Sequence, residues 1–356
     1  MMTANFSPRP VSGPGHAYGT HRAIAPLGAL PQPAERISND FSKLYDGELL
    51  LEVQTLNVDA ASFRQMEEAV GSAAGVPAKV LETVAARGKQ HNPVTGSGGM
   101  LLGRVLQVTP GHPGALVLKP GDRVATLVSL SLTPLRIDSV EAVRAVSAQL
   151  DVRGEAVLFA SGPYALMPSD FSDRLALALF DVAGAAPQVA RWTHPGQSVL
   201  VLGAGGKSGV LCAAEARRRV GPSGRVYGIE NHKPFADELR ALGLCDAVFE
   251  ADARDPVSVR AAVMQATAGR EVDVSFSCVN VEGAELGAIL STRDRGVVYF
   301  FAMSTSFTRA ALGAEGCGKD VDLLIGNGYA NNHADHTLEL VRSLPAVAAL
   351  FEARYG

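Results

Sequence analysis

The sequence predicts an α/β protein with two domains: a β-rich domain first, and then a doubly wound parallel sheet with helices on both faces. Two patterns lead to this prediction. Before residue 172 the apolar residues favour strands and turns, with only short helical stretches between them. After residue 172 strand and helix patterns alternate strictly, which is typical of a parallel sheet. The length of 356 residues is enough for two domains with cores of ordinary size.

The first half contains strand patterns, two helical patterns and many turns. The first fifteen residues, rich in Ser, Pro and Gly, are predicted to be a flexible arm. The predicted elements that follow are a strand at 48–56, helices at 62–70 and 78–87 (the second ended by Gly88), a Gly- and Ser-rich stretch at 93–99, a strand at 101–108, and a turn from Lys119 that leads into another strand.

The second half repeats a strand–helix unit. A helical pattern runs over 173–191 and a turn follows at Pro195-Gly196. Five strands are then predicted at 198–203, 225–230, 247–252, 273–279 and 296–301, with helices between them at 210–220, 234–242 and 256–268 and a short helix before the last strand.

Composition excludes several classes of protein. Hydrophobic residues make up 47% and charged residues 19%, as expected for a globular chain. The net charge of −4 gives no indication of a nucleic-acid partner. No apolar run reaches the roughly 18 residues needed to span a bilayer, and the N-terminus lacks the apolar core of a signal peptide. We therefore expect a cytoplasmic protein with no membrane partner.

A glycine-rich loop, GAGGKSG, follows one strand and opens a helix. Glycines permit the tight turn and the close approach of a pyrophosphate, which the N–H groups at the helix start can bind. Glu230 ends the next strand, 21 residues after Gly209, near the spacing of an acid that binds the adenosine ribose. A P-loop is excluded because only two residues separate Gly203 from Gly206. The predicted cofactor is NAD, although His232 and Lys233 soften the preference over NADP. The predicted cofactor-binding residues of this loop are Gly203, Gly205, Gly206, Lys207, Ser208 and Gly209.

The domain order and the segment KPGDRVA resemble the medium-chain dehydrogenase/reductase superfamily, in its quinone-reductase and enoyl-reductase branch. This resemblance implies a GroES-like catalytic domain at 16–172 and 303–356, and a Rossmann domain at 173–302. Zinc-dependent members use Cys and His ligands in the first domain. The first cysteine here is Cys212, so no metal site is expected.

Six segments spread along the chain carry a more specific resemblance. They are GTHRAIAPLGALPQPA from Gly19, NPVTGSGGM from Asn92, LVSLSLTPLRID from Leu127, DVAGAAPQVA from Asp181, FTRAALGAEGCGKDV from Phe307 and GNGY from Gly326. These segments resemble the L-erythro-3,5-diaminohexanoate dehydrogenase family. The resemblance implies oxidative deamination of the 3-amino group of the substrate to give 5-amino-3-oxohexanoate, ammonia and NADH.

The alternative function is a zinc-free NAD(P)H-dependent reductase of quinones or enoyl thioesters. We also expect a homo-oligomer, either a dimer or a tetramer.

A diamino acid substrate needs carboxylates for its ammonium groups and a base for the reacting amine. Asp181 lies within an apolar stretch that reads as a helix start, where an unpartnered carboxylate is costly. We assign Asp181 to the reacting amine and Asp59 to the distal one. A helix N-cap or an internal salt bridge for Asp181, and a turn cap for Asp59, are equally good explanations. His91 titrates in a useful range and is a further candidate base, as is His333.

Further candidates concern the rest of the substrate and the nicotinamide. Ser129, Ser131 and Thr133 alternate as on one face of a strand and could line the pocket, or form a solvated face. Candidates for the substrate carboxylate are Arg136 and Lys319, which are otherwise ordinary surface cations. Ligands bind at the carboxyl ends of parallel strands, so the residues just past the fourth and fifth strands, Asn280 and Met303, are expected to border the nicotinamide.

Overall fold

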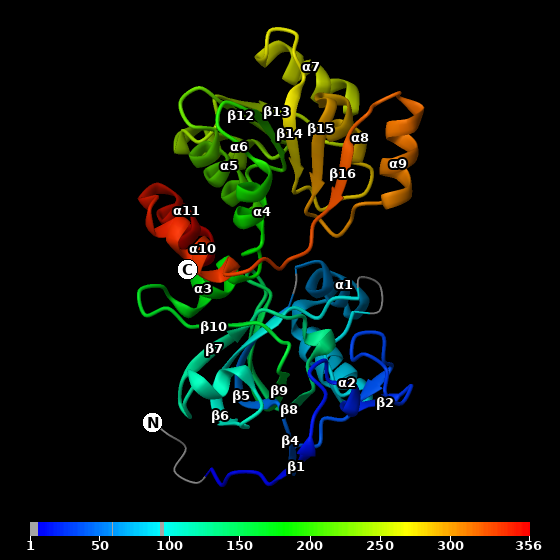
Figure 1. Cartoon of the computed structure of the whole chain (residues 1–356), viewed down its shortest axis with the longest axis vertical. Coiled ribbons are helices and arrows are strands. Elements are labelled where there is room, and N and C mark those ends of the chain that lie inside the picture. The colour runs from blue at the N-terminus through cyan, green and yellow to red at the C-terminus, as the bar shows by residue number, and fades with distance from the viewer. Residues whose placement is uncertain (1–5, 59, 93–95) are drawn as a thin grey trace. The chain divides into compact units, whose positions relative to one another are not determined.

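A computed structural model of the protein describes residues 6–58, 60–92 and 96–356. The chain divides into two units: unit 1 comprises Met1–Asp181 with Tyr355, and unit 2 comprises Val182–Arg354 with Gly356. Figure 1 shows both units and labels many of their helices and strands. Among the described residues, each helix is too short or too polar to span a bilayer.

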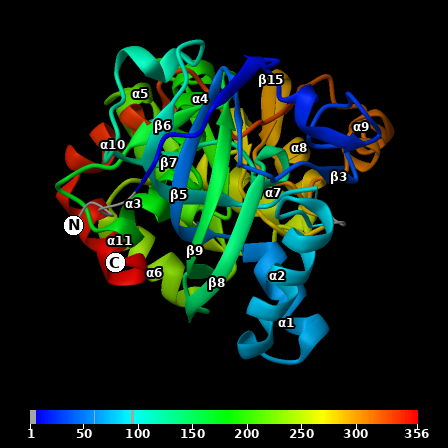
Figure 2. The ribbon, with the colours of Figure 1, turned by 90° about the horizontal axis from the view of Figure 1, so that it is seen from below.

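Unit 1 contains an antiparallel sheet whose strand order is β10-β7-β6-β5-β9-β8. Figure 2 shows β5, β9 and β8 side by side. Nearly every residue of β5 is buried, because this strand lies in the middle of the sheet with side chains packed on both faces. The strands are β5 (Glu48–Asn57), β6 (Met100–Val108), β7 (Arg123–Thr126), β8 (Leu135–Arg144), β9 (Gln149–Phe159) and β10 (Tyr164–Leu166).

Short elements and helices complete unit 1, and the two predicted helices of this region are confirmed. They are α1 (Ala60–Val70) and α2 (Val76–Arg87). Gly88 ends α2 with φ of +73°, and a Cβ there would lie 2.0 Å from the Ile37 carbonyl oxygen. The other elements of unit 1 are η1 (Thr20–Arg22), β2 (Ala23–Ala25), β3 (Arg36–Ile37), η2 (Ala73–Gly75), η3 (Pro113–Leu116), η4 (Leu130–Leu132) and α3 (Asp173–Phe180).

The segment predicted as a flexible arm forms a strand over part of its length, so that prediction is wrong there. β1 (Val11–Pro14) pairs in parallel with β4 (Leu44–Asp46). Before it, the backbone N–H of Arg9 donates to Gln107 Oε1 at 2.7 Å. The Ser-, Pro- and Gly-rich composition indicated disorder, but hydrogen bonds to distant residues order this stretch.

Unit 2 contains a parallel sheet whose strand order is β13-β12-β11-β14-β15-β16. The five predicted strands are confirmed. They are β11 (Ser198–Leu202), β12 (Arg225–Glu230), β13 (Ala247–Glu250), β14 (Val272–Ser277) and β15 (Thr292–Phe300). The helices of this unit are α4 (Ala185–Trp192), α5 (Lys207–Val220), α6 (Lys233–Leu242), α7 (Pro256–Ala266), α8 (Glu285–Ser291), α9 (Phe307–Gly316), α10 (His333–Arg342) and α11 (Pro345–Tyr355).

The strand β16 (Asp322–Ile325) was not predicted, and it changes the division of the chain. It extends the parallel sheet at the β15 edge. Residues 303–354 therefore belong to unit 2, whereas the sequence assigned 303–356 to the first domain. The first boundary also differs, since unit 2 begins at Val182 rather than at residue 173. A four-residue edge strand carries too little periodicity to be recognised from sequence.

The single helix predicted over 173–191 is two helices, α3 and α4, separated by a turn that contains Asp181. Pro187 explains the break. In a continuous helix its ring would clash with the Ala183 carbonyl and leave that carbonyl unpaired. Instead, the Ala183 carbonyl accepts a hydrogen bond from Thr337 Oγ1 at 2.8 Å.

The strand order of unit 2 creates a topological switch point at one edge of the sheet. From β11 the chain passes outward to β12 and β13, and then returns to β14 on the other side of β11. Connections therefore diverge at the carboxyl ends of β11 and β14. Open α/β sheets bind their ligands at such a switch point.

Candidate active site

The glycine-rich loop connects β11 to α5 in a conformation that requires glycine. Gly203 has φ of +70°, in the left-handed region. A Cβ on Gly209 would lie 2.0 Å from the Gly203 carbonyl oxygen. Together these two positions fix the tight turn and let α5 begin directly beneath it.

The start of α5 fits a pyrophosphate. Gly206 is its N-cap and provides no side-chain cap for the first N–H groups of this 14-residue helix. Lys207 and Ser208 are half-buried at this end. The helix dipole and the uncapped N–H groups favour an anion here, so this geometry fits the phosphates of a dinucleotide.

Glu230 lies beside the same loop, at the end of β12. Its Oε2 accepts from the Gly205 N–H and its Oε1 accepts from the His232 N–H, both at 3.0 Å. Its exposed fraction is 6%. The carboxylate is therefore fixed next to the loop, where an acid that binds a ribose is expected.

The two residues expected to border the nicotinamide lie at the edge of the sheet that carries the loop. Asn280 follows the end of β14 and Met303 follows the end of β15, and both are exposed. These positions agree with the predicted ones at the carboxyl ends of the strands. Their contact with a cofactor stays a prediction.

In unit 1, two buried amides hold the carboxylate of Asp181. Gln149 Nε2 donates to Asn57 Oδ1 at 3.1 Å, and Asn57 Nδ2 donates to Asp181 Oδ1 at 3.3 Å. Asn57 ends β5 and Gln149 opens β9, and the two residues pair directly across the sheet. We call these three residues the amide–carboxylate cluster. Asn57 donates to Asp181 directly, and Gln149 orients the Asn57 amide.

The position of Asp181 differs from the predicted one. It lies at the C-cap of α3 rather than at a helix start, and it is half-buried. A role as an N-cap is therefore wrong. Neither amide of the cluster was identified from the sequence, because only the pairing of β5 with β9 brings Asn57 and Gln149 to Asp181.

A pair of glycines packs the neighbouring segments against this cluster. A Cβ on Gly99 would lie 2.1 Å from the Asn57 carbonyl oxygen, and one on Gly98 would lie 2.4 Å from the Gln90 carbonyl oxygen. The backbones of Gln90 and Asn57 are therefore both packed against this pair of glycines. Gln90 Oε1, His91 Nδ1 and Gln149 Oε1 are among the buried atoms of the described residues that can accept a hydrogen bond and have no partner.

His91 and Lys89 are both shifted toward their neutral forms. Burial lowers the pKa of His91, and the charges of Lys89 and Arg87 lower it further. Burial also lowers the pKa of Lys89 to about 8, with a contribution from Arg87. Lys89 Nζ donates to the Gln32 carbonyl at 2.8 Å. His91 is consequently neutral near pH 7 and able to accept a proton.

The predicted strand face of hydroxyl groups is wrong. Residues 130–132 form η4, and Ser129 caps it by accepting from the Ser131 N–H at 3.3 Å. Ser131 and Thr133 are buried, with exposed fractions of 0% and 1%. Thr133 Oγ1 donates to the Ser129 carbonyl at 3.3 Å. Most of these hydroxyls bond within their own turn. Serine and threonine side chains bond readily to nearby backbone groups, and here this favours a capped 3₁₀ turn over a strand.

The cations predicted for the substrate carboxylate are both in ion pairs. Arg136, on the edge strand β8, bonds to Glu155 at 2.9 Å and to Asp138 at 3.2 Å. Lys319 bonds to Glu271 at 2.8 Å. Glu271 directly precedes β14, so Lys319 lies at the amino edge of the parallel sheet, opposite the glycine-rich loop. These positions do not favour substrate binding.

Asp59, predicted to bind the distal amine, lies outside the described residues. For a metal, the described residues contain no group of three or more His, Cys, Asp or Glu side chains able to hold one.

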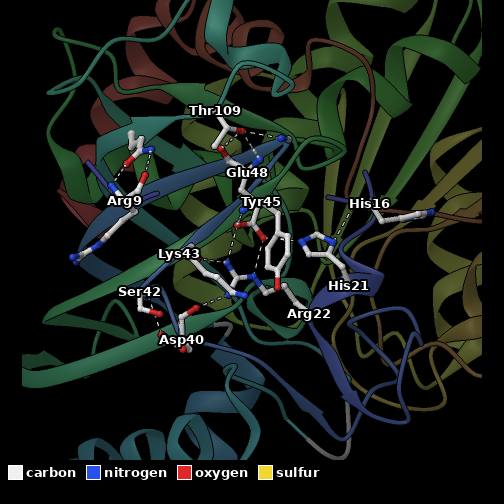
Figure 3. A network of polar contacts seen from close by, with 12 residues as sticks. Arg9, His16, His21, Arg22, Asp40, Ser42, Lys43, Tyr45, Glu48 and Thr109 are labelled. Carbon is white, nitrogen blue, oxygen red and sulfur yellow. Dashed lines mark hydrogen bonds and ion pairs between the residues drawn. The ribbon is translucent and has the colours of Figure 1, made fainter. Parts of the chain in front are cut away.

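Another buried charge cluster in unit 1 serves stability, and Figure 3 shows it. Arg22 and Glu48 are 2% and 0% exposed. Arg22 Nε and Nη2 bond to the two carboxylate oxygens at 2.8 and 2.7 Å, and His21 Nε2 lies 2.8 Å from Glu48 Oε1. Glu48 Oε2 also accepts from the Tyr45 N–H at 2.9 Å. Each carboxylate oxygen has two partners, so this cluster fastens the N-terminal segment to β5.

Comparison with known proteins identifies related chains. The model for the L-erythro-3,5-diaminohexanoate dehydrogenase N-terminal domain matches residues 21–168. An L-erythro-3,5-diaminohexanoate dehydrogenase from Acetoanaerobium sticklandii is 51% identical over 96% of this chain and 99% of its own length. One of the same name from Fusobacterium nucleatum is 48% identical over the same shares.

Solved structures share the fold at low sequence identity. The structure titled AibC has a TM-score of 0.56 at 19% identity, covering 85% of this chain and 79% of its own. Escherichia coli quinone oxidoreductase in complex with NADPH has a TM-score of 0.53 at 17% identity, covering 85% and 81%. These matches support the predicted fold of a GroES-like domain and a Rossmann domain.

Proposed function

This chain belongs to the L-erythro-3,5-diaminohexanoate dehydrogenase family, so it is an oxidoreductase that acts on an amino group, and we propose how its residues perform that reaction with NAD. The reaction converts L-erythro-3,5-diaminohexanoate to 5-amino-3-oxohexanoate and ammonia. The substrate carries two ammonium groups, and its C3 amine is the reacting one. A protein that binds it must provide hydrogen-bond acceptors and negative charge.

The observation that carries the proposal is the amide–carboxylate cluster. Gln149 and Asn57 donate in series toward Asp181, which fixes the orientation of the carboxylate. Nearby segments add buried acceptors on Gln90 and His91. An ammonium group is a donor with three N–H bonds, so a carboxylate with further acceptors suits it. Asp181 binds the C3 amine in this proposal.

Hydride can leave C3 only after the amine loses its proton. His91 is the proposed base, because its lowered pKa keeps the imidazole neutral and one ring nitrogen lacks a partner among the described residues. After His91 has released this proton to solvent, it can take a proton from the water that adds to the imine carbon and pass it to the nitrogen, which leaves as ammonia while the C3 hydroxyl loses its proton to become the ketone. Asp181 is the alternative base. The assignment of Asp59 to the distal amine stays a prediction.

The cofactor is a nicotinamide dinucleotide, which when bound supplies the acceptor for the C3 hydride. Gly203, Gly206 and the first N–H groups of α5 hold its pyrophosphate. Glu230 receives the adenosine ribose hydroxyls and repels a 2′-phosphate, so we propose NAD as the natural cofactor.

The test is the Asp181→Asn variant, assayed by NAD reduction with synthetic 3,5-diaminohexanoate. This change keeps the size of the side chain and removes its charge. We expect kcat/KM for the amine to fall about 100-fold or more, equivalent to roughly 3 kcal/mol, while NAD affinity is unchanged. The pH dependence of kcat/KM separates the two candidate bases. If His91 is the base, its ionisation, with a pKa below the usual histidine value, remains in the pH profile of Asp181→Asn. If Asp181 is the base, the ionisation of the base disappears from the profile of the variant.

Asp173→Asn is the matched control. Asp173 lies at the other end of α3, in a half-exposed ion pair with Arg123. Its replacement should leave turnover unchanged. Near-normal turnover by Asp181→Asn would remove Asp181 from the site. Reduction of quinones by the wild-type protein with no turnover of the amine would contradict the proposed reaction as a whole.

A further inference from the structure

The last helix of the chain reaches the glycine-rich loop through one side chain. Arg354 Nη1, at the end of α11, donates to the Gly205 carbonyl at 2.7 Å. Its Nη2 forms an ion pair with Glu238 of α6. The guanidinium carbon lies 4.0 Å from the centre of the Phe235 ring. In Figure 1, α11 is the red helix that ends the chain.

Gly205 is therefore held on both sides of its Cα. Glu230 accepts from its N–H, and Arg354 donates to its carbonyl oxygen. A Cβ on Gly205 would lie 2.7 Å from Phe235 Cβ, so the loop also packs closely against α6. The backbone that approaches the cofactor phosphates is thus fixed by a residue about 150 positions away.

The burial of the Arg354 side chain costs free energy, because its charge loses contact with water. Its side chain is only 11% exposed. Among the described residues, its buried Nε has no hydrogen-bond partner. A long cationic side chain normally extends into water, where its charge is solvated. Here the cation is stacked on the Phe235 ring, paired with Glu238 and bonded to the Gly205 carbonyl, which keeps it beside the glycine-rich loop.

We propose that Arg354 is a positioning residue for the adenosine half of the dinucleotide. It holds the Gly205 peptide in the conformation that receives the ribose and the pyrophosphate. In this way α11 stabilises the loop through one side chain. The inference rests on the proposed function, since it assumes that this loop binds a nicotinamide dinucleotide. It adds the C-terminal helix to the binding site.

The experiment uses the full-length protein and three probes: NAD, ADP-ribose, which lacks the nicotinamide, and nicotinamide mononucleotide, which lacks the adenosine. Arg354→Met keeps the apolar stem on Phe235 and removes the donors. Calorimetry should show NAD and ADP-ribose binding weakened about tenfold or more, because a charge-assisted hydrogen bond is lost. Affinity for nicotinamide mononucleotide and kcat at saturating NAD should change little. Arg354→Lys should restore part of the affinity, because it keeps the charge.

Arg240→Met is the matched control. Arg240 lies on α6 and pairs with Asp237 and Glu250 without touching the loop, so binding of all three probes should be unchanged. Unchanged or tighter ADP-ribose binding by Arg354→Met would overturn the inference, as would an equal loss for nicotinamide mononucleotide. If the wild-type protein binds none of the three probes, the proposed cofactor site fails instead.

Discussion

Both carboxylate oxygens of Glu230 accept hydrogen bonds from backbone N–H groups, so the position of this side chain at the end of β12 does not depend on a bound ligand. A carboxylate fixed in this way has lone pairs left for ribose hydroxyls but repels a phosphate. At the scale of single residues, the proposed preference for NAD over NADP therefore depends chiefly on the charge of Glu230.

The Glu230→Gln variant removes that charge and keeps the shape of the side chain. We expect the preference for NAD over NADP to shrink about tenfold, because a repulsion worth roughly 1.4 kcal/mol is lost. The ratio of kcat/KM values for the two cofactors measures it. Wild-type protein that prefers NADP would contradict the role given to Glu230.

At the scale of elements, the junction of β11 with α5 depends on glycines that no other residue can replace. Gly209 is the clearest case, since a Cβ there would meet the Gly203 carbonyl oxygen at 2.0 Å and the Ala204 Cα at 2.7 Å. Both atoms are backbone and cannot rotate away. The tight turn and the start of the helix are thus one structural unit.

We expect Gly209→Ala to destabilise the protein by about 2 kcal/mol and to abolish measurable NAD binding, because the loop must move to admit a methyl group. Thermal unfolding and calorimetry measure the two effects. Gly316→Ala is the control. Gly316 lies at the end of α9 with no atom within 4 Å of the added Cβ, so this change should be neutral or stabilise by up to about 1 kcal/mol. Tight NAD binding by Gly209→Ala would contradict the described loop.

At the scale of the whole molecule, each unit has its own core, and unit 1 also depends on the buried pair Arg22–Glu48. Burial raises the pKa of Glu48, but the hydrogen bonds from Arg22 and His21 and the charge of Arg22 outweigh it and hold the pKa below the usual value of 4.5. Because the pKa of Glu48 is lowered in the folded state, the pair stabilises the protein at pH values above the usual pKa of 4.5. This contribution is lost as the pH falls through the folded pKa.

Glu48→Gln should therefore lower the stability at neutral pH by about 3–5 kcal/mol, because Arg22 is left as an uncompensated buried charge. The difference from wild type should narrow in acid, where Glu48 itself becomes protonated. Denaturant unfolding at several pH values measures this trend. Glu68→Gln, which breaks an exposed pair with Arg64, should cost about 0.5 kcal/mol or less. A pH-independent difference for Glu48→Gln would contradict this explanation.

The sequence by itself determined the features that depend on local pattern. Five parallel strands, the glycine-rich loop and the acid at Glu230 follow from periodicity and spacing along short stretches, and the structure agrees with each. The resemblance of scattered segments supplied the substrate, which no local pattern could supply.

Only the tertiary structure decided which distant residues meet. Asn57 and Gln149 reach Asp181 because β5 pairs with β9, and Arg354 reaches Gly205 because α11 packs within unit 2. The differences from the sequence predictions have two origins. The hydroxyls near Ser131 bond within their own turn, a local alternative that the alternating pattern did not reveal. Lys319 pairs with Glu271, which lies 48 positions away in the chain. Hydrogen bonds between residues far apart in the chain outweigh local preference, and a sequence read in short windows contains no record of them.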